Sequence, residues 1–157
     1  MKNLIILSSI AGLAMAGTVL AGEPSAALPS PDGLVTWSLD VRDGKAAHSL
    51  KRKDKTVLEP SGLGIVVNGK DLAGGITGWS VKKVKDNVRD TFETRGKYPS
   101  ASVHFNEYVV SGDNSGLRLR ARVFNNGVAF RYEWTEDVQK APVLNIGEEK
   151  TSFAFPE

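Results

Sequence analysis

The segment from Arg118 to Trp134 constrains the fold most, because two runs of alternating apolar and polar residues flank Asn126-Gly127. Asn-Gly between such runs is the typical signal of a two-residue turn, so the segment is predicted to form a β-hairpin. The predicted register places apolar residues opposite one another on one face: Val123 and Phe130, Ala121 and Tyr132, Leu119 and Trp134. A slip of one residue would mix charged and apolar side chains on that face, which a half-buried sheet does not tolerate.

The same register places Arg122 opposite Arg131. Like charges directly across a strand pair are unfavourable, by at most about 1 kcal/mol, so an acidic residue is expected nearby. Glu107 or Glu133 is the candidate, and Arg120 opposite Glu133 is predicted to form an ordinary exposed ion pair. The favoured interpretation is a solvated outer face of a sheet. The alternative is a polar contact surface for another domain or for a sugar.

The rest of the sequence also favours short antiparallel strands. Leu34–Arg42 alternates apolar and polar residues, Asp43-Gly44 marks a turn, and Ala46, His48 and Leu50 return on the same face, which predicts a second hairpin. Further strands are expected at 56–58, 63–67, 79–88, 89–97, 102–110 and 117–124, with a break at 59–62. No segment has a convincing helical period. The predicted fold class is therefore all-β, an antiparallel β-sandwich.

The N-terminus has the composition of an export signal. Lys2 precedes an apolar run broken by small residues, and residues 1–21 are predicted to be a signal peptide cleaved after Ala21. Residues 22–31 are expected to form a flexible lead-in, and residues 32–157 an incomplete N-terminal sandwich domain. The expected location is periplasmic or secreted, with no membrane association after cleavage.

Composition excludes several classes of partner and site. The sequence has no cysteine, so disulfides and thiolate metal sites are excluded. Its 20 basic residues are scattered and nearly balanced by 18 acidic residues, so a nucleic-acid partner is not expected. His48 lies on a predicted apolar face and His104 in a strand, without the spacing of a metal site, and both are interpreted as packing histidines.

The sequence gives equally weak support for a catalytic role of any serine or carboxylate. Ser115 lies in a Gly-rich loop that lacks the spacing of a nucleophile elbow. Glu148 and Glu149 are adjacent and would point to opposite faces of a strand, so no acid/base pair can be assigned. Five aromatic residues could form a sugar-stacking platform but are better interpreted as core: Trp37, Trp79, Trp134, Tyr98 and Tyr108.

Several motifs in order closely resemble the N-terminal domain of glycoside hydrolase family 97. They run from about Ser30 to Glu157: residues 30–33 (SPDG), 55–61 (KTVLEPS) followed by Leu63-Gly64, Asn106-Glu107, 123–133 (VFNNGVAFRYE) and 148–156 with Thr151, Phe153 and Phe155. The resemblance implies an exported bacterial α-glycosidase that acts on α-glucosides or α-galactosides. In that family a sandwich resembling galactose mutarotase-like domains precedes a catalytic (β/α)8 barrel, and a calcium ion lies near the active site.

The chain ends before that barrel, so it is expected to hold only the first part of the sandwich. No catalytic, cofactor-binding or metal-binding residue is carried over, and calcium is implied only for the full-length family. The leading hypothesis is a carbohydrate-binding or accessory part of a glycoside hydrolase that is not catalytic alone. Its expected partners are carbohydrate and the missing barrel of the same polypeptide. Two alternatives stay open: a stand-alone secreted carbohydrate-binding sandwich without hydrolase activity, and a non-functional remnant of a broken gene.

Overall fold

The computed structural model describes residues 26–96, 99–134 and 143–157, and all regular secondary structure in these ranges is β. The strands are β1 (Ala26–Pro29), β2 (Val35–Arg42), β3 (Lys45–Arg52), β4 (Lys55–Gly62), β5 (Ile65–Val67), β6 (Lys70–Asp71), β7 (Gly78–Glu93), β8 (Ser100–Asp113), β9 (Arg118–Phe124), β10 (Gly127–Tyr132) and β11 (Ile146–Glu149). No helix in the described ranges is long and apolar enough to span a membrane.

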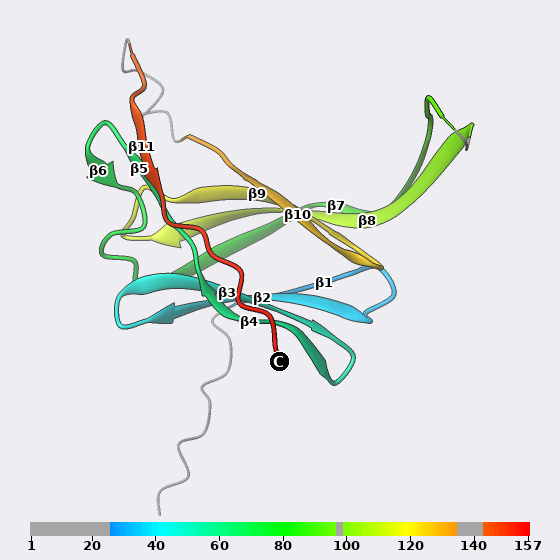
Figure 1. Ribbon diagram of the computed structural model, residues 1–157, viewed down its shortest axis with the longest axis horizontal. Helices are drawn as coiled ribbons and strands as arrows, with labels where there is room; N and C mark the ends of the chain where they lie inside the picture. The colour runs from blue at the N-terminus through cyan, green and yellow to red at the C-terminus, as the bar shows by residue number, and fades with distance from the viewer. Residues whose placement is uncertain (1–25, 97–98, 135–142) are drawn as a thin grey trace, which may run out of the picture.

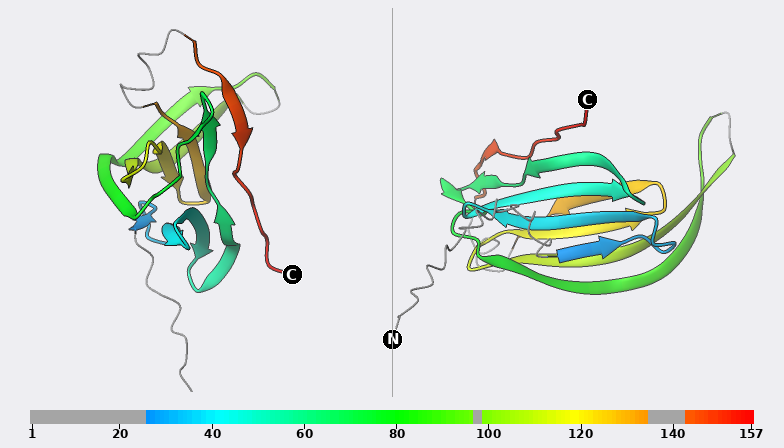
Figure 2. Two further views of the ribbon diagram at one scale, coloured as in Figure 1. Left: turned by 90° about the vertical axis from the view of Figure 1, so that its left-hand side faces the viewer. Right: turned by 90° about the horizontal axis from the view of Figure 1, so that it is seen from below.

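Two antiparallel four-stranded sheets form the body of the molecule (Figure 1), in the orders β1-β2-β3-β4 and β10-β9-β8-β7. A small third sheet, β11-β5-β6, lies at one end. The end-on view in Figure 2 shows the two main sheets as layers. Their facing side chains form the core, in which Trp37 and Leu39 of the first sheet and Val110, Leu119 and Val123 of the second are completely buried. The predicted all-β sandwich is therefore confirmed.

The β2–β3 hairpin has the predicted register. Val41 pairs with Ala46 and Leu39 with His48. Asp43 and Gly44 have φ angles of 49° and 69°, as expected for a two-residue turn with both angles positive.

The β9–β10 hairpin forms, but its predicted register is wrong by two residues. Phe124 pairs with Gly127, so the turn lies at Asn125-Asn126, and Arg131 faces Arg120 rather than Arg122. A shift of two residues keeps every side chain on its predicted face. The turn is anchored through Asn125, whose Oδ1 accepts a hydrogen bond of 3.3 Å from the backbone N–H of Asp32.

Three further predictions need correction. The expected lead-in includes β1, because Ala26 and Leu28 are buried against the core and the backbone pairs with β2. The predicted break at 59–62 lies within β4, where the register of the β3–β4 pair shifts around Pro60 and so accommodates a residue without a backbone N–H. The two strands expected at 79–88 and 89–97 form one long strand, β7, which bends at register shifts and extends with β8 as an arm (Figure 1).

The C-terminal segment packs along the chain that connects the sheets. β11 pairs with β5, and the N–H groups of Lys150 and Ser152 then donate to the carbonyls of Gly64 and Gly62 at 2.8 and 3.0 Å. The segment therefore continues in an extended course beside β4, where Ala154 forms an isolated bridge with Glu59.

Candidate functional site

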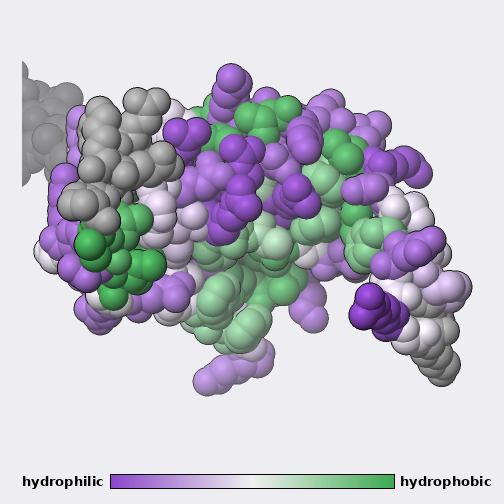
Figure 3. Space-filling model, turned by 90° about the horizontal axis from the view of Figure 1, so that it is seen from above, coloured by the Kyte–Doolittle hydropathy of each residue, from purple (hydrophilic) through white to green (hydrophobic). Residues whose placement is uncertain are grey.

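The outer surface of the second sheet has the densest cluster of charged side chains. On β9, Arg118, Arg120 and Arg122 alternate with core residues and therefore share the outer face. We call this cluster the arginine face and define it as Arg118, Arg120, Arg122 and Arg131 together with Glu107 and Glu133. When the molecule is viewed from above, hydrophilic side chains gather over its upper middle, next to a hydrophobic area below them (Figure 3).

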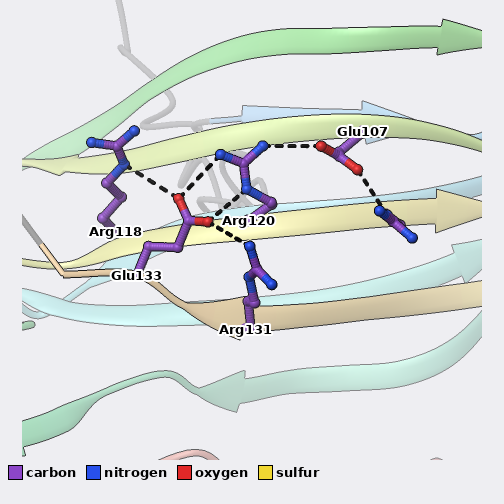
Figure 4. Close-up of polar contacts among 6 residues, drawn as sticks. Glu107, Arg118, Arg120, Arg131 and Glu133 are labelled. Atoms are coloured by element: carbon purple, nitrogen blue, oxygen red, sulfur yellow. Dashed lines mark hydrogen bonds and ion pairs between the residues drawn. The ribbon is translucent and has the colours of Figure 1, made fainter.

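Arg120 lies at the centre of the arginine face (Figure 4). Its Nε donates to Glu133 Oε1 at 2.6 Å and its Nη1 to Glu107 Oε1 at 2.9 Å. Glu107 also accepts from Nε of Arg122 at 2.7 Å, and Glu133 from Nη2 of Arg131 at 3.0 Å. The acidic partners expected from the sequence are confirmed, and they offset the repulsion between the opposed residues Arg120 and Arg131. The predicted exposed Arg120–Glu133 pair forms, but its side chains are only 29% and 18% exposed, and Arg120 lies opposite Arg131 rather than Glu133.

The environment of both carboxylates favours their charged form. Glu107 is only 2% exposed, and this burial acts to raise its pKa, but the hydrogen bonds from Arg122 and Arg120 outweigh it and hold the pKa below the ordinary value. The hydrogen bond from Arg120 is the main cause that lowers the pKa of Glu133. Neither group is therefore suited to donate a proton at neutral pH.

A shallow hollow of about 260 Å³ opens beside this network. Arg120, Arg122 and Arg131 line it together with Ala129 and Phe130. Arg122 and Arg131 are 49% and 71% exposed at the side chain, so their guanidinium groups reach solvent. The arrangement is suited to recognise an anion rather than to carry out acid/base chemistry.

His48 is a packing histidine, as predicted. Trp37 Nε1 donates to its Nδ1 at 3.2 Å, so its Nε2 carries the proton and donates to the carbonyl of Ser152 at 3.0 Å. His104 lies at the base of the arm, where its Nε2 contacts the side-chain oxygen of Asn87. No group of three or more potential metal ligands occurs within the described ranges.

The four candidate aromatic residues that the structure describes do not form an exposed platform. Trp37, Trp79 and Tyr108 are buried, and Trp134 packs partly buried against the core, whereas Tyr98 lies outside the described residues. The core interpretation is confirmed for the three buried residues.

The other residues considered as catalytic candidates either have a structural role or lie outside the arginine face. Ser115 Oγ donates to the Gly112 carbonyl, which closes the loop between β8 and β9. Glu148 and Glu149 are exposed on β11. Sequence reasoning missed the central position of Arg120, although the alternation of three arginines along β9 was a usable signal for a single charged face.

Comparison with known proteins identifies the family. A family model described as "Glycosyl-hydrolase 97 N-terminal" matches residues 28–157. The chain belongs to glycoside hydrolase family 97. The resemblance seen in the sequence motifs is thus confirmed, and the match covers β2 to β11 and the second half of β1.

Individual relatives of this family 97 chain are much longer. A "Probable retaining alpha-galactosidase" of Streptomyces bingchenggensis is 35% identical over 99 residues, which are 60% of this chain and 15% of the relative. The crystal structure of a β-arabinopyranosidase is similar with a TM-score of 0.68 and 30% identity, over 84% of this chain and 21% of that one. A family 97 enzyme from Pseudoalteromonas sp. strain K8, in complex with panose, has a TM-score of 0.63 and 24% identity, over 83% and 20%. The chain therefore spans about a fifth of these relatives or less.

Proposed function

We propose that this chain is the accessory, carbohydrate-binding N-terminal β-sandwich of an exported α-glycosidase and is not catalytic by itself. The family match over residues 28–157 is the observation that supports this proposal. In the parent protein, a catalytic barrel of the same polypeptide would hydrolyse α-glucosides or α-galactosides, and the sandwich would support it. Export rests on residues 1–21, which lie outside the described residues.

The calcium ion that the family resemblance implies does not fit the two carboxylates of the arginine face. The buried carboxylate of Glu107 already accepts hydrogen bonds from two arginines, and Glu133 is bound by its own arginine partners. These cations oppose a second positive charge at the same oxygens. We therefore assign calcium to other parts of the parent protein and none to the arginine face.

Calorimetric titration of the full chain with maltotriose and melibiose tests the binding part of this proposal. Saturable heat with a millimolar dissociation constant is expected for at least one of these α-linked sugars, and weaker heat for the β-linked control cellobiose. Absence of heat at millimolar concentrations of both α-linked sugars would contradict binding of neutral α-linked sugars. The same result would count against the alternative of a stand-alone protein that binds such sugars.

A further inference from the structure

The arginine face retains hydrogen-bonding capacity beyond its own ion pairs. Arg120 binds both glutamates through three nitrogen atoms. By contrast, hydrogen bonds among the described residues occupy only Nε of Arg122 and one terminal nitrogen of Arg131. The guanidinium of Arg122 also lies over the Phe105 ring, with its Cζ 4.7 Å from the ring centroid, a contact that uses none of its N–H donors. A guanidinium has five N–H donors, so Arg122 and Arg131 both keep N–H groups that can bind a ligand.

These two arginines are close enough to act together. Arg131 pairs with Arg120 and Arg122 with Ala129, which makes Arg122 and Arg131 diagonal neighbours across β9 and β10. Diagonal positions of a sheet lie about 7–8 Å apart, within the reach of two long side chains. Both residues also line the hollow of about 260 Å³. An anion in that hollow can therefore accept hydrogen bonds from both.

We propose that this hollow binds one carboxylate group, carried by a small acid of monosaccharide size such as a hexuronic acid. Arginine forms paired, charge-assisted hydrogen bonds with carboxylates, which a neutral sugar cannot supply. The volume lies below the roughly 300–1,000 Å³ of sites for larger ligands, which favours a ligand of one sugar ring. This site is independent of the binding of neutral α-linked sugars proposed above.

The charge balance of the face favours a small acid over an acidic protein surface. Glu107 and Glu133 already bind Arg120, and Glu133 lies directly beside Arg131 in the network. An extended acidic segment laid along β9 and β10 would approach these carboxylates and be repelled. A single carboxylate between Arg122 and Arg131 meets the free donors instead.

Nuclear magnetic resonance titration of the full chain with sodium glucuronate tests the site, with glucose as the neutral control at the same ionic strength. We expect saturable shifts of the side-chain signals of Arg122 and Arg131 with a millimolar dissociation constant, and no saturable shift with glucose. R131Q should weaken glucuronate binding by about tenfold or more, the effect of losing hydrogen bonds between charged groups. R89Q, which alters an exposed arginine on the arm, is the matched control and should leave the affinity unchanged.

Equal responses to glucuronate and glucose would overturn this proposal, as would unchanged affinity in both R131Q and R122Q. Because the side chain of Arg131 is 71% exposed, R131Q is expected to fold. The R131Q result therefore decides the test even if R122Q destabilises the chain by removing a partner of the buried Glu107. Binding of a glutamate-rich peptide without binding of glucuronate would also overturn it and assign the face to a protein partner. Failure with maltotriose and melibiose would leave this site untouched.

Discussion

Glu107 is the residue on which the arginine face most depends, because its buried carboxylate accepts hydrogen bonds from both Arg120 and Arg122. Glu107→Gln places an amide donor against two guanidinium groups, and we expect it to lower the free energy of unfolding by about 1–3 kcal/mol. Urea denaturation measures this change. D86N removes the exposed ion pair with Lys83 and is expected to cost less than about 0.5 kcal/mol. Equal costs for the two variants would contradict the role assigned to Glu107.

His48 should make the stability of the sandwich depend on pH. Burial lowers its pKa below the ordinary value of 6.5, against the opposing effect of the hydrogen bond to Ser152. The unfolded chain therefore takes up a proton at a higher pH than the folded chain does. The free energy of unfolding is thus expected to decrease as the pH falls below 6.5 and to level off below the folded pKa.

Urea midpoints measured between about pH 7.5 and pH 5.5 test this, because carboxylates titrate mainly at lower pH. H48Q should flatten the pH dependence over this range. A slope that persists in H48Q would show that another group is responsible.

At the scale of elements, the two hairpins differ in whether the glycine at the turn needs a positive φ angle. Gly44 has a φ of 69°, whereas Gly127 has no such left-handed angle, and nothing lies within 4 Å of a Cβ added at either position. G44A is therefore expected to cost about 1–2 kcal/mol through backbone strain alone. G127A should change the free energy of unfolding by less than about 0.5 kcal/mol. Equal costs in urea denaturation would favour the predicted Asn126-Gly127 turn over the observed one.

The same comparison explains how far sequence predicts these elements. In β2–β3, local alternation and Asp43-Gly44 both specify one register, and the structure has it. In β9–β10, two registers bury the same side chains, so alternation cannot choose between them. The contact of Asn125 with Asp32 spans 93 residues and has no local signal.

The site was predictable to a similar extent. Alternation placed the arginines of β9 on one outer face and led to the expectation of an acidic partner. It could not indicate that Glu107 would be almost fully buried, because this depends on how β8 and β9 pack side by side. The bond between His48 and Ser152, 104 residues apart, has no counterpart in any local pattern.

At the scale of the whole molecule, polar contacts join the two main sheets into one body. The carbonyl of Pro29 in β1 accepts hydrogen bonds from Tyr108 and Asn106 of β8 at 2.8 and 3.0 Å. Trp79 of β7 donates to the carbonyl of Asp40 in β2 at 3.1 Å. The result is a sandwich whose buried polar groups serve packing, whereas the proposal of an accessory domain rests on the family match.

Hydrolysis of nitrophenyl α-glucoside and nitrophenyl α-galactoside by the purified chain, with calcium present, tests that proposal most directly. A full-length family 97 enzyme with a known α-glycoside substrate is the positive control. We predict no release of nitrophenol above the rate without protein, because the arginines keep Glu107 and Glu133 charged, so neither can supply the general acid that glycoside hydrolysis needs. Turnover that purifies with the chain and saturates with substrate would contradict the account.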